Sequence, residues 1–246
     1  MPCGKNGVSA IQVNEEILDI LYQDDRYVAI DKPDGLLVHR SPIDKGETRF
    51  CVQILRDQLG KRVYPCHRLD KPTSGVLLFA LDKEALSLAN ALFMEHQIQK
   101  TYHAIVRGWV SEPGIIDHPL KDLDEGGSVR GGGPAQTRFN PLKHFEVNHP
   151  VGRFPTARYS LVELVPETGR MHQLRRHMKH AHHHIIGDTR YGDGAHNRLF
   201  RDLYGSHRLL LNASILSFTH PFGSGACEIR TTPQPPTFEL KLPSVD

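Results

Sequence analysis

The sequence HRLDKPTSG at residues 67–75, followed by the apolar run VLLFAL at residues 76–81, decides how the central part of this chain folds. Asp-Lys-Pro and Ser-Gly are turn signals, and the proline and the glycine constrain the backbone around the carboxylate of Asp70. The apolar run predicts a strand that begins directly after the turn. The pattern therefore predicts a loop that holds Asp70 and Arg68 at the mouth of a strand, where binding and catalytic residues concentrate.

Asp70 has two interpretations at this point. A carboxylate nucleophile or base has to be ionised and oriented, and a nearby guanidinium favours the charged form. Arg68 is two residues away, and Arg175 lies in a basic segment far along the chain. The alternative is a turn aspartate whose side chain accepts hydrogen bonds from the amides of Thr73 or Ser74, as most such aspartates do. Spacing alone favours the turn aspartate.

The composition is that of a globular protein. The 246 residues suffice for one large domain or two small ones, and 39% of them are hydrophobic and 24% charged. No run approaches the roughly 20 apolar residues of a membrane span. Residues 1–16 lack the apolar centre of a signal peptide, so we expect a flexible tail there and a cytoplasmic protein. The four cysteines are dispersed without a C-x-x-C pair, which favours reduced thiols.

Local charge is more informative than the formal net charge of +2, which by itself requires no nucleic-acid partner. Residues 168–179 contain no acid, and such a basic segment can bind phosphates. Apolar residues recur at helical spacing over residues 171–181, which predicts a helix with one apolar stripe. The polar side of that helix carries His172, Arg175, Arg176 and Lys179.

Other chemistries find little support. Five histidines lie between residues 177 and 184, but no H-E-x-x-H motif or nearby cysteine accompanies them, so a solvated helix end is favoured over a metal site. The glycines at 131–133 lack the G-K-[ST] or G-x-G-x-x-G pattern, so no nucleotide cofactor is expected. Ser74 is not in a G-x-S-x-G elbow, which disfavours a serine hydrolase.

The residue patterns predict an α+β fold with a mixed, mostly antiparallel sheet and flanking helices, because strands outnumber helices and the βαβ rhythm is irregular. Strands are expected within residues 18–31, 36–39, 76–81, 102–110, 156–165 and 209–218, and helices over 49–59, 82–93 and 171–181. Residues 121–136 are charged and then glycine-rich. They predict a mobile loop or insertion, or a binding loop that becomes ordered on contact with a partner.

Four blocks, in this order, resemble the motifs of the RluA family of pseudouridine synthases. They are KPDGLLVH at 32–39, HRLDKPTSG at 67–75, KTYHAIVRG at 100–108 and PETGRMHQLRRH at 166–177, followed by IIGD at 185–188 and YG at 191–192. The resemblance spans about residues 17–221, and the second and fourth blocks together are highly specific. Segments 36–41, 95–100 and 152–159 are most similar to a member of the family that modifies uridine 65 of tRNA.

The resemblance implies an isomerase that breaks the C1′–N1 bond of a uridine in RNA and remakes it as C1′–C5, with no metal or cofactor. It makes Asp70 the essential carboxylate, which attacks C1′ or abstracts the proton at C2′. Tyr102 would stack on the uracil and serve in proton transfer, and Arg175 would pair with Asp70 and keep it ionised. Arg68 would fill the gap left by the extruded base. The remaining expected RNA contacts are His67, Arg170, His172, Gln173, Arg176 and Lys179.

These implications lead us to expect a flexible tail at 1–16 and, over residues 17–246, a single catalytic domain with a central active-site cleft that acts as a monomer on RNA, foremost tRNA. Three alternatives stay open: a ribosomal RNA substrate, a non-catalytic RNA-binding protein with the same fold, and a histidine-rich metallohydrolase. The presence of Asp70 and Tyr102 argues against the second, and the third would require bound zinc.

Overall fold

The computed structural model describes residues 17–40, 46, 48–123, 128–223, 225–231 and 243–245, and the structural statements below concern these residues. The strands are β1 (Asp19–Gln23), β2 (Tyr27–Lys32), β3 (Tyr64–Pro65), β4 (Ser74–Ala80), β5 (Gln99–Arg107), β6 (Gly114–Asp117), β7 (Leu120–Leu123), β8 (Val129–Gly133), β9 (Gln136–Val147), β10 (Ala157–Pro166), β11 (Leu211–Thr219), β12 (Ala226–Arg230) and β13 (Ser244–Val245). The helices are α1 (Cys51–Leu59), α2 (Lys83–Met94), α3 (Gln173–His180) and α4 (Gly194–Tyr204).

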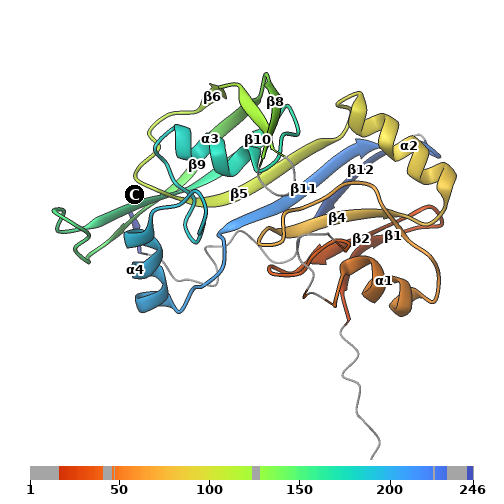
Figure 1. The fold of residues 1–246 in the computed structure, drawn as a ribbon, viewed down its shortest axis with the longest axis horizontal. Helices are drawn as coiled ribbons and strands as arrows, with labels where there is room; N and C mark the ends of the chain where they lie inside the picture. The colour runs from red at the N-terminus through yellow and green to blue at the C-terminus, as the bar shows by residue number, and fades with distance from the viewer. Residues whose placement is uncertain are drawn as a thin grey trace, which may run out of the picture.

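One long sheet forms the body of the molecule, with helices on both of its faces (Figure 1). Within the described residues its strands follow the order β1-β2-β4-β11-β5-β10-β9-β13, while β12, β3 and β6 pair with β11, β4 and β9. The pairing is antiparallel except between β4 and β11, which run parallel. The predicted α+β class with a mixed, mostly antiparallel sheet is confirmed.

Strand β4 is buried at every position, because helices cover both faces of the sheet there. Val76 and Leu78 point to one face and pack in the cluster that contains α2, whereas Leu77 and Phe79 point to the other face and pack in the cluster that contains α1. Each such side chain contributes roughly 1.5–3 kcal/mol by its burial. The apolar run after the Asp70 turn is therefore a strand at the centre of one half of the sheet.

The other half of the sheet repeats this arrangement with different helices. Leu174 and Met178 of α3 pack on one face of β5 and β10, and Leu199 and Phe200 of α4 pack on the opposite face. Strand β11 lies between β4 and β5 and joins the two halves. The Asp70 turn, β5 and α3 consequently meet over the middle of the sheet (Figure 1).

The helix signals of the sequence are confirmed. Asp82 precedes α2, and its carboxylate accepts a hydrogen bond from the amide of Ala85 at 2.8 Å, as expected of an N-cap. Helix α1 ends at Gly60, whose φ of 64° is the left-handed conformation that glycine supplies at a helix end. The helix predicted over 171–181 is α3, which begins two residues later than expected, after His172 in the left-handed region.

The strand predicted at residues 36–39 is wrong. That segment has one isolated bridge, between Leu37 and Phe50, in place of a ladder. The reason is the buried ammonium of Lys32, which donates to the carbonyls of Pro33 and Leu36 at 2.8 and 2.7 Å and curls the chain around itself. The carbonyl of Leu36 therefore accepts a hydrogen bond from a side chain in place of a neighbouring strand.

The glycine-rich segment at 121–136 is more regular than a mobile loop. β7 and β8 pair as an antiparallel hairpin, and residues 124–127 at its turn lie outside the described residues. Gly132 of β8 permits the close approach of β7, since a Cβ at this position would lie 3.1 Å from the carbonyl oxygen of Leu120. The segment predicted as a mobile loop or insertion, or as a binding loop, therefore contains two paired strands that the sequence patterns did not indicate.

Two further expectations concern the chain as a whole. The tail predicted at residues 1–16 lies outside the described residues. Among the helices that the structure describes, none combines the length and apolar character that crossing a bilayer requires.

Candidate active site

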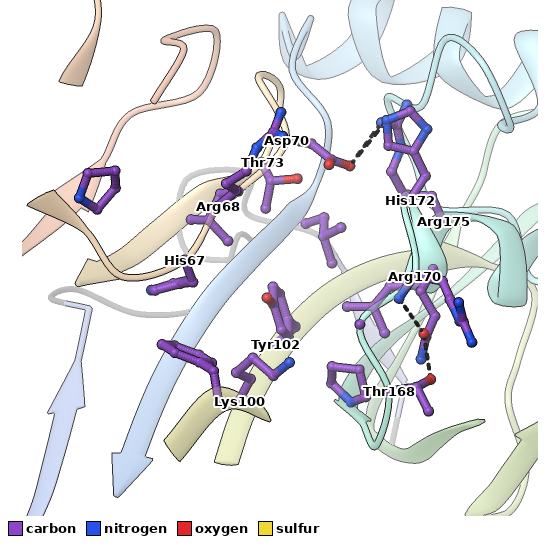
Figure 2. A pocket seen from close by; sticks show the side chains of 18 of the residues that line it. His67, Arg68, Asp70, Thr73, Lys100, Tyr102, Thr168, Arg170, His172 and Arg175 are labelled. Carbon is purple, nitrogen blue, oxygen red and sulfur yellow. Dashed lines mark hydrogen bonds and ion pairs between the residues drawn. The ribbon is translucent and has the colours of Figure 1, made fainter. Parts of the chain in front are cut away.

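An open cavity of about 570 Å³ lies where the Asp70 turn, β5 and the start of α3 meet. Figure 2 shows these side chains pointing into it from the three elements. Eight of the ten predicted site residues line the cavity, and the other two, Arg176 and Lys179, lie further along α3. The lining residues among the ten are His67, Arg68, Asp70, Tyr102, Arg170, His172, Gln173 and Arg175.

The backbone of the turn is fixed by hydrogen bonds that leave the carboxylate of Asp70 available. The amide of Thr73 donates to the backbone carbonyl of Asp70 at 2.9 Å, not to its side chain. The carbonyl of Lys71 accepts from the amide of Gly35 at 2.9 Å and from Nζ of Lys32 at 3.1 Å. No hydrogen bond from a turn amide to the carboxylate occurs in the described residues, which removes the main support for the turn-aspartate alternative.

The Asp70 carboxylate faces Arg175 across the cavity. Nη1 of Arg175 donates to Oδ2 of Asp70 at 3.2 Å, and Nε2 of His172 lies 3.7 Å from the same oxygen. Burial lowers the pKa of His172, although the Asp70 charge acts in the opposite direction. Arg175 is thus the cation beside Asp70, as the resemblance implied.

Arg175 is itself held from behind by a second carboxylate. Its Nε and Nη2 donate to the two oxygens of Asp188 at 2.7 and 2.9 Å, and both side chains are almost fully buried. The amides of Arg190 and Tyr191 donate to Asp188 at 2.9 Å each. Burial opposes ionisation of Asp188, but the guanidinium and the amides outweigh it and lower its pKa. The guanidinium is therefore fixed at two atoms while a third points at Asp70.

Sequence reasoning missed this positioning function of Asp188. The residue stands in the IIGD segment that follows the last family block, but neither its spacing nor its composition reveals a contact with α3.

Tyr102 lines the same cavity as the ion pair, from β5 (Figure 2). Its neighbour on β11 is Ala213, which in turn pairs with Gly75 of β4. Gly75 has a φ of 112°, and a Cβ there would lie 2.2 Å from the carbonyl oxygen of Ala213. Burial, with a further contribution from the charge of Asp70, raises the pKa of Tyr102. The phenol is therefore protonated at neutral pH, and its ring offers a flat face to a planar ligand.

Two predicted RNA contacts have their polar atoms engaged within the protein. Nε2 of His67 accepts from the amide of Leu78 at 3.1 Å, and burial lowers the pKa of His67 to about 3, so the ring is neutral. Gln173 is buried, accepts from Thr168 and the amide of Arg170 at 2.6 and 3.0 Å, and donates to the carbonyl of residue 136. Both residues shape the cavity wall.

The remaining basic residues lie around the cavity and on its rim. Arg170 is one-third exposed, donates to Asp122 at 2.8 Å and lies against Gly133 of the β7–β8 hairpin. Arg176 donates to two backbone carbonyls, at 2.9 and 3.2 Å. Lys179 and Arg68 are exposed. The expected basic face of α3 is thus narrower than the sequence indicated, because Arg175 points inward to the two carboxylates.

The histidine-rich segment is less solvated than predicted. His177 is fully buried, with its ring between Thr137 and the carbonyl of His118 at 2.9 and 3.0 Å. His183 and His184 make hydrogen bonds to backbone carbonyls at 2.9 and 2.7 Å. These rings connect α3 and the following turn to the sheet. The interpretation as a solvated helix end was therefore wrong for the buried member.

The site thus combines a carboxylate paired with a buried arginine and a protonated tyrosine in one cavity with a basic rim. A family model described as RNA pseudouridylate synthase matches residues 26–180. The chain belongs to this family, as an RluA-type pseudouridine synthase, and is an isomerase.

Relatives and solved structures agree with this assignment. The chain is 54% identical over 211 residues to tRNA pseudouridine synthase C of Vibrio parahaemolyticus. The aligned region covers 83% of this chain and 86% of the relative. It is 50% identical over 220 residues to the protein of the same name from Vibrio cholerae, covering 87% and 90%. The structure of human RNA Pseudouridylate Synthase Domain Containing 1 superposes with a TM-score of 0.73 at 25% identity, covering 100% of this chain and 92% of that chain. Domain Containing 4 gives 0.67 at 26% identity, covering 91% and 93%.

Proposed function

We propose that this protein converts uridine 65 of tRNA to pseudouridine, with Asp70 as the essential carboxylate. The observation that carries the catalytic part is that the Asp70–Arg175 pair and Tyr102 line one cavity. The tRNA substrate is supported by two relatives called tRNA pseudouridine synthase C, which are 54% and 50% identical to this chain. Position 65 rests on the similarity of segments 36–41, 95–100 and 152–159. Residues 17–246 act as one catalytic domain, as a cytoplasmic monomer.

In this mechanism the target uridine leaves the RNA stack and enters the cavity, at a cost of a few kcal/mol for unstacking. The uracil lies against the ring of Tyr102, and Asp70 acts at C1′ as a nucleophile or at C2′ as a base. As the C1′–N1 bond breaks, its electron pair moves onto the uracil. The base turns and C5 bonds to C1′, which releases the carboxylate of Asp70 on the nucleophilic route and is accompanied by return of the C2′ proton on the other route. The proton at C5 leaves to a base, and N1, which kept the electron pair, takes up a proton. Substrate and product have the same atoms, so no oxidant or reductant is required.

Arg175 prepares Asp70 for this step. Its guanidinium favours the ionised carboxylate and fixes which oxygen faces the cavity. Because Asp188 holds the guanidinium at two atoms, Arg175 keeps this orientation without substrate, which lowers the entropy cost of aligning the reacting groups.

Phosphate binding is assigned to the basic rim. Arg68 and Arg170 line the cavity, and Arg176 and Lys179 follow on α3, which begins at the cavity. Such contacts position RNA without reading its sequence and weaken as salt rises. Arg68, exposed and next to the turn, is the residue assigned to the gap left by the flipped base.

The test is Asp70→Ala, assayed by release of tritium from tRNA labelled at C5 of uridine and by electrophoretic binding. We expect isomerisation to fall by about 10³-fold or more while tRNA affinity stays within a few-fold. Asp57→Asn is the matched control, because Asp57 is exposed and pairs with the adjacent Arg56. Activity that survives in Asp70→Ala would overturn the mechanism.

The substrate is tested separately by mapping pseudouridine in tRNA and ribosomal RNA from a strain that lacks the protein. Loss at tRNA position 65 alone supports the proposal. Loss at a ribosomal site with normal tRNA would transfer the assignment to ribosomal RNA.

A further inference from the structure

Lys100 lines the active-site cavity, and neither the family assignment nor the sequence patterns gave it a function. It lies on β5 two residues before Tyr102, and alternation along a strand puts both side chains on the same face. Figure 2 shows the lysine beside the tyrosine at the end of the cavity away from Asp70. The bulge in the neighbouring pairing lies on β11, so the alternation of β5 is unbroken there.

The ammonium of Lys100 has no hydrogen bond or ion pair within the described part of the chain. Burial lowers the pKa of Lys100, and no carboxylate offsets that effect. Lys100 is half-buried, and a partly desolvated ammonium without a partner costs the fold free energy. Lys32 provides the contrast, since its fully buried ammonium donates to three backbone carbonyls and serves the fold.

The neighbours of Lys100 do not supply an internal partner. The His67 ring beside it is neutral, and Phe93, which packs on that ring, is apolar. The Asp70 carboxylate acts on the pKa of Tyr102 but not on that of Lys100, and it is engaged by Arg175. The cavity therefore has a carboxylate and its cation at one end and a separate, unneutralised cation at the other.

We propose that the ammonium of Lys100 binds an oxygen of the target nucleotide that carries negative charge, and so holds the flipped uridine from the side opposite Asp70. This assignment rests on the proposed function, in which the uracil lies against Tyr102. Two oxygens have the required chemistry. One is a phosphate oxygen beside the target nucleotide. The other is a uracil carbonyl oxygen, which gains charge when the electron pair of the C1′–N1 bond moves onto the ring.

The experiment compares Lys100→Met and Lys100→Arg with wild type, and uses Lys61→Met, an exposed lysine outside the cavity, as control. The tRNA dissociation constant is measured across a salt series, and the isomerisation rate is measured in single turnover with saturating enzyme. A phosphate contact lowers the slope of log K against log salt by about 0.7–0.9 in Lys100→Met, with a rate close to wild type. A uracil contact leaves the slope unchanged and lowers the rate by about 10²-fold. Lys100→Arg keeps the charge and is expected to recover part of either loss.

Thermal unfolding separates these results from a structural function. Lys100→Met is expected to melt at or above the wild-type temperature, because it removes a half-buried ammonium that has no partner within the described residues. A clearly lower melting temperature, or a variant that matches wild type and Lys61→Met in both slope and rate, would overturn the inference. Active Asp70→Ala would instead refute the proposed function, so the two failures are distinguishable.

Discussion

Replacing Asp188 with asparagine removes one charge from the buried pair that holds Arg175. The guanidinium loses a carboxylate that accepts two hydrogen bonds, at 2.7 and 2.9 Å, and the new amide group sets a donor against a donor. Removing one partner of a buried ion pair costs about 3–5 kcal/mol. Asp70 remains as a second anion 3.2 Å away, so we expect the lower end of that range, about 3 kcal/mol.

Thermal unfolding followed by circular dichroism measures this loss. In a chain of this length 1 kcal/mol lowers the melting temperature by roughly 2–4 °C, so Asp188→Asn should melt about 6–12 °C below wild type at pH 7. Isomerisation should fall as well, because Arg175 is no longer held toward Asp70. Asp57→Asn is the control, since its exposed pair with Arg56 contributes little.

The difference in melting temperature between wild type and Asp188→Asn should also depend on pH, with a sign that follows from the pKa of Asp188. The pKa of Asp188 is lowered in the folded state, so its contribution to stability is complete above the unfolded pKa of about 4 and is lost as the pH falls through the folded value. The difference in melting temperature between wild type and Asp188→Asn should therefore be constant from pH 6 to 8 and narrow below pH 4. A gap under about 2 °C at pH 7, or one that widens in acid, would refute the reasoning.

Three other variants follow from the same contacts. Gly75→Ala should give little soluble protein, since its Cβ would lie 2.2 Å from the carbonyl oxygen of Ala213; soluble yield checks this, and normal expression would contradict it. Tyr102→Phe keeps the ring and loses the proton donor, so tRNA affinity should hold while single-turnover isomerisation falls by about 10²-fold or more; an unchanged rate would remove the phenol from the chemistry. Lys32→Met leaves the carbonyls of Pro33 and Leu36 without the ammonium donor and takes one of two donors from the carbonyl of Lys71, which should lower the free energy of unfolding in urea by about 2–4 kcal/mol; a loss below about 1 kcal/mol would contradict this.

Local sequence signals predicted the elements that depend on local physics. Helix α2 follows from the Asp82 cap and an apolar stripe, and β4 follows from an unbroken apolar run. The prediction of a strand at residues 36–39 was wrong because the ammonium of Lys32 binds this segment. No hydrophobic pattern reveals that contact. At residues 121–136 the opposite happened, since two strands are present that the sequence did not predict. The glycines there allow the strands to approach closely, but they weaken the usual sequence signal for a strand.

The site shows a similar division. Asp70 and Arg175 are 105 residues apart, so their contact was expected from the family blocks and not from spacing. The same blocks placed His67 and Gln173 among RNA contacts, although their polar atoms bind the protein's own backbone and side chains. A shared motif does not distinguish a residue that touches substrate from one that builds the wall. Asp188 could not be identified, since the fold brings it under α3 from a separate segment.

The place of β11 in the sheet has a consequence for how the enzyme comes into being. This strand is made after both of its neighbours, yet it is inserted between β4, which follows Asp70, and β5, which bears Tyr102. Until β11 has left the ribosome, the two strands lack the partner that aligns them. The growing polypeptide is therefore expected to be catalytically silent until synthesis has passed β11, well after Asp70 and Tyr102 have been made.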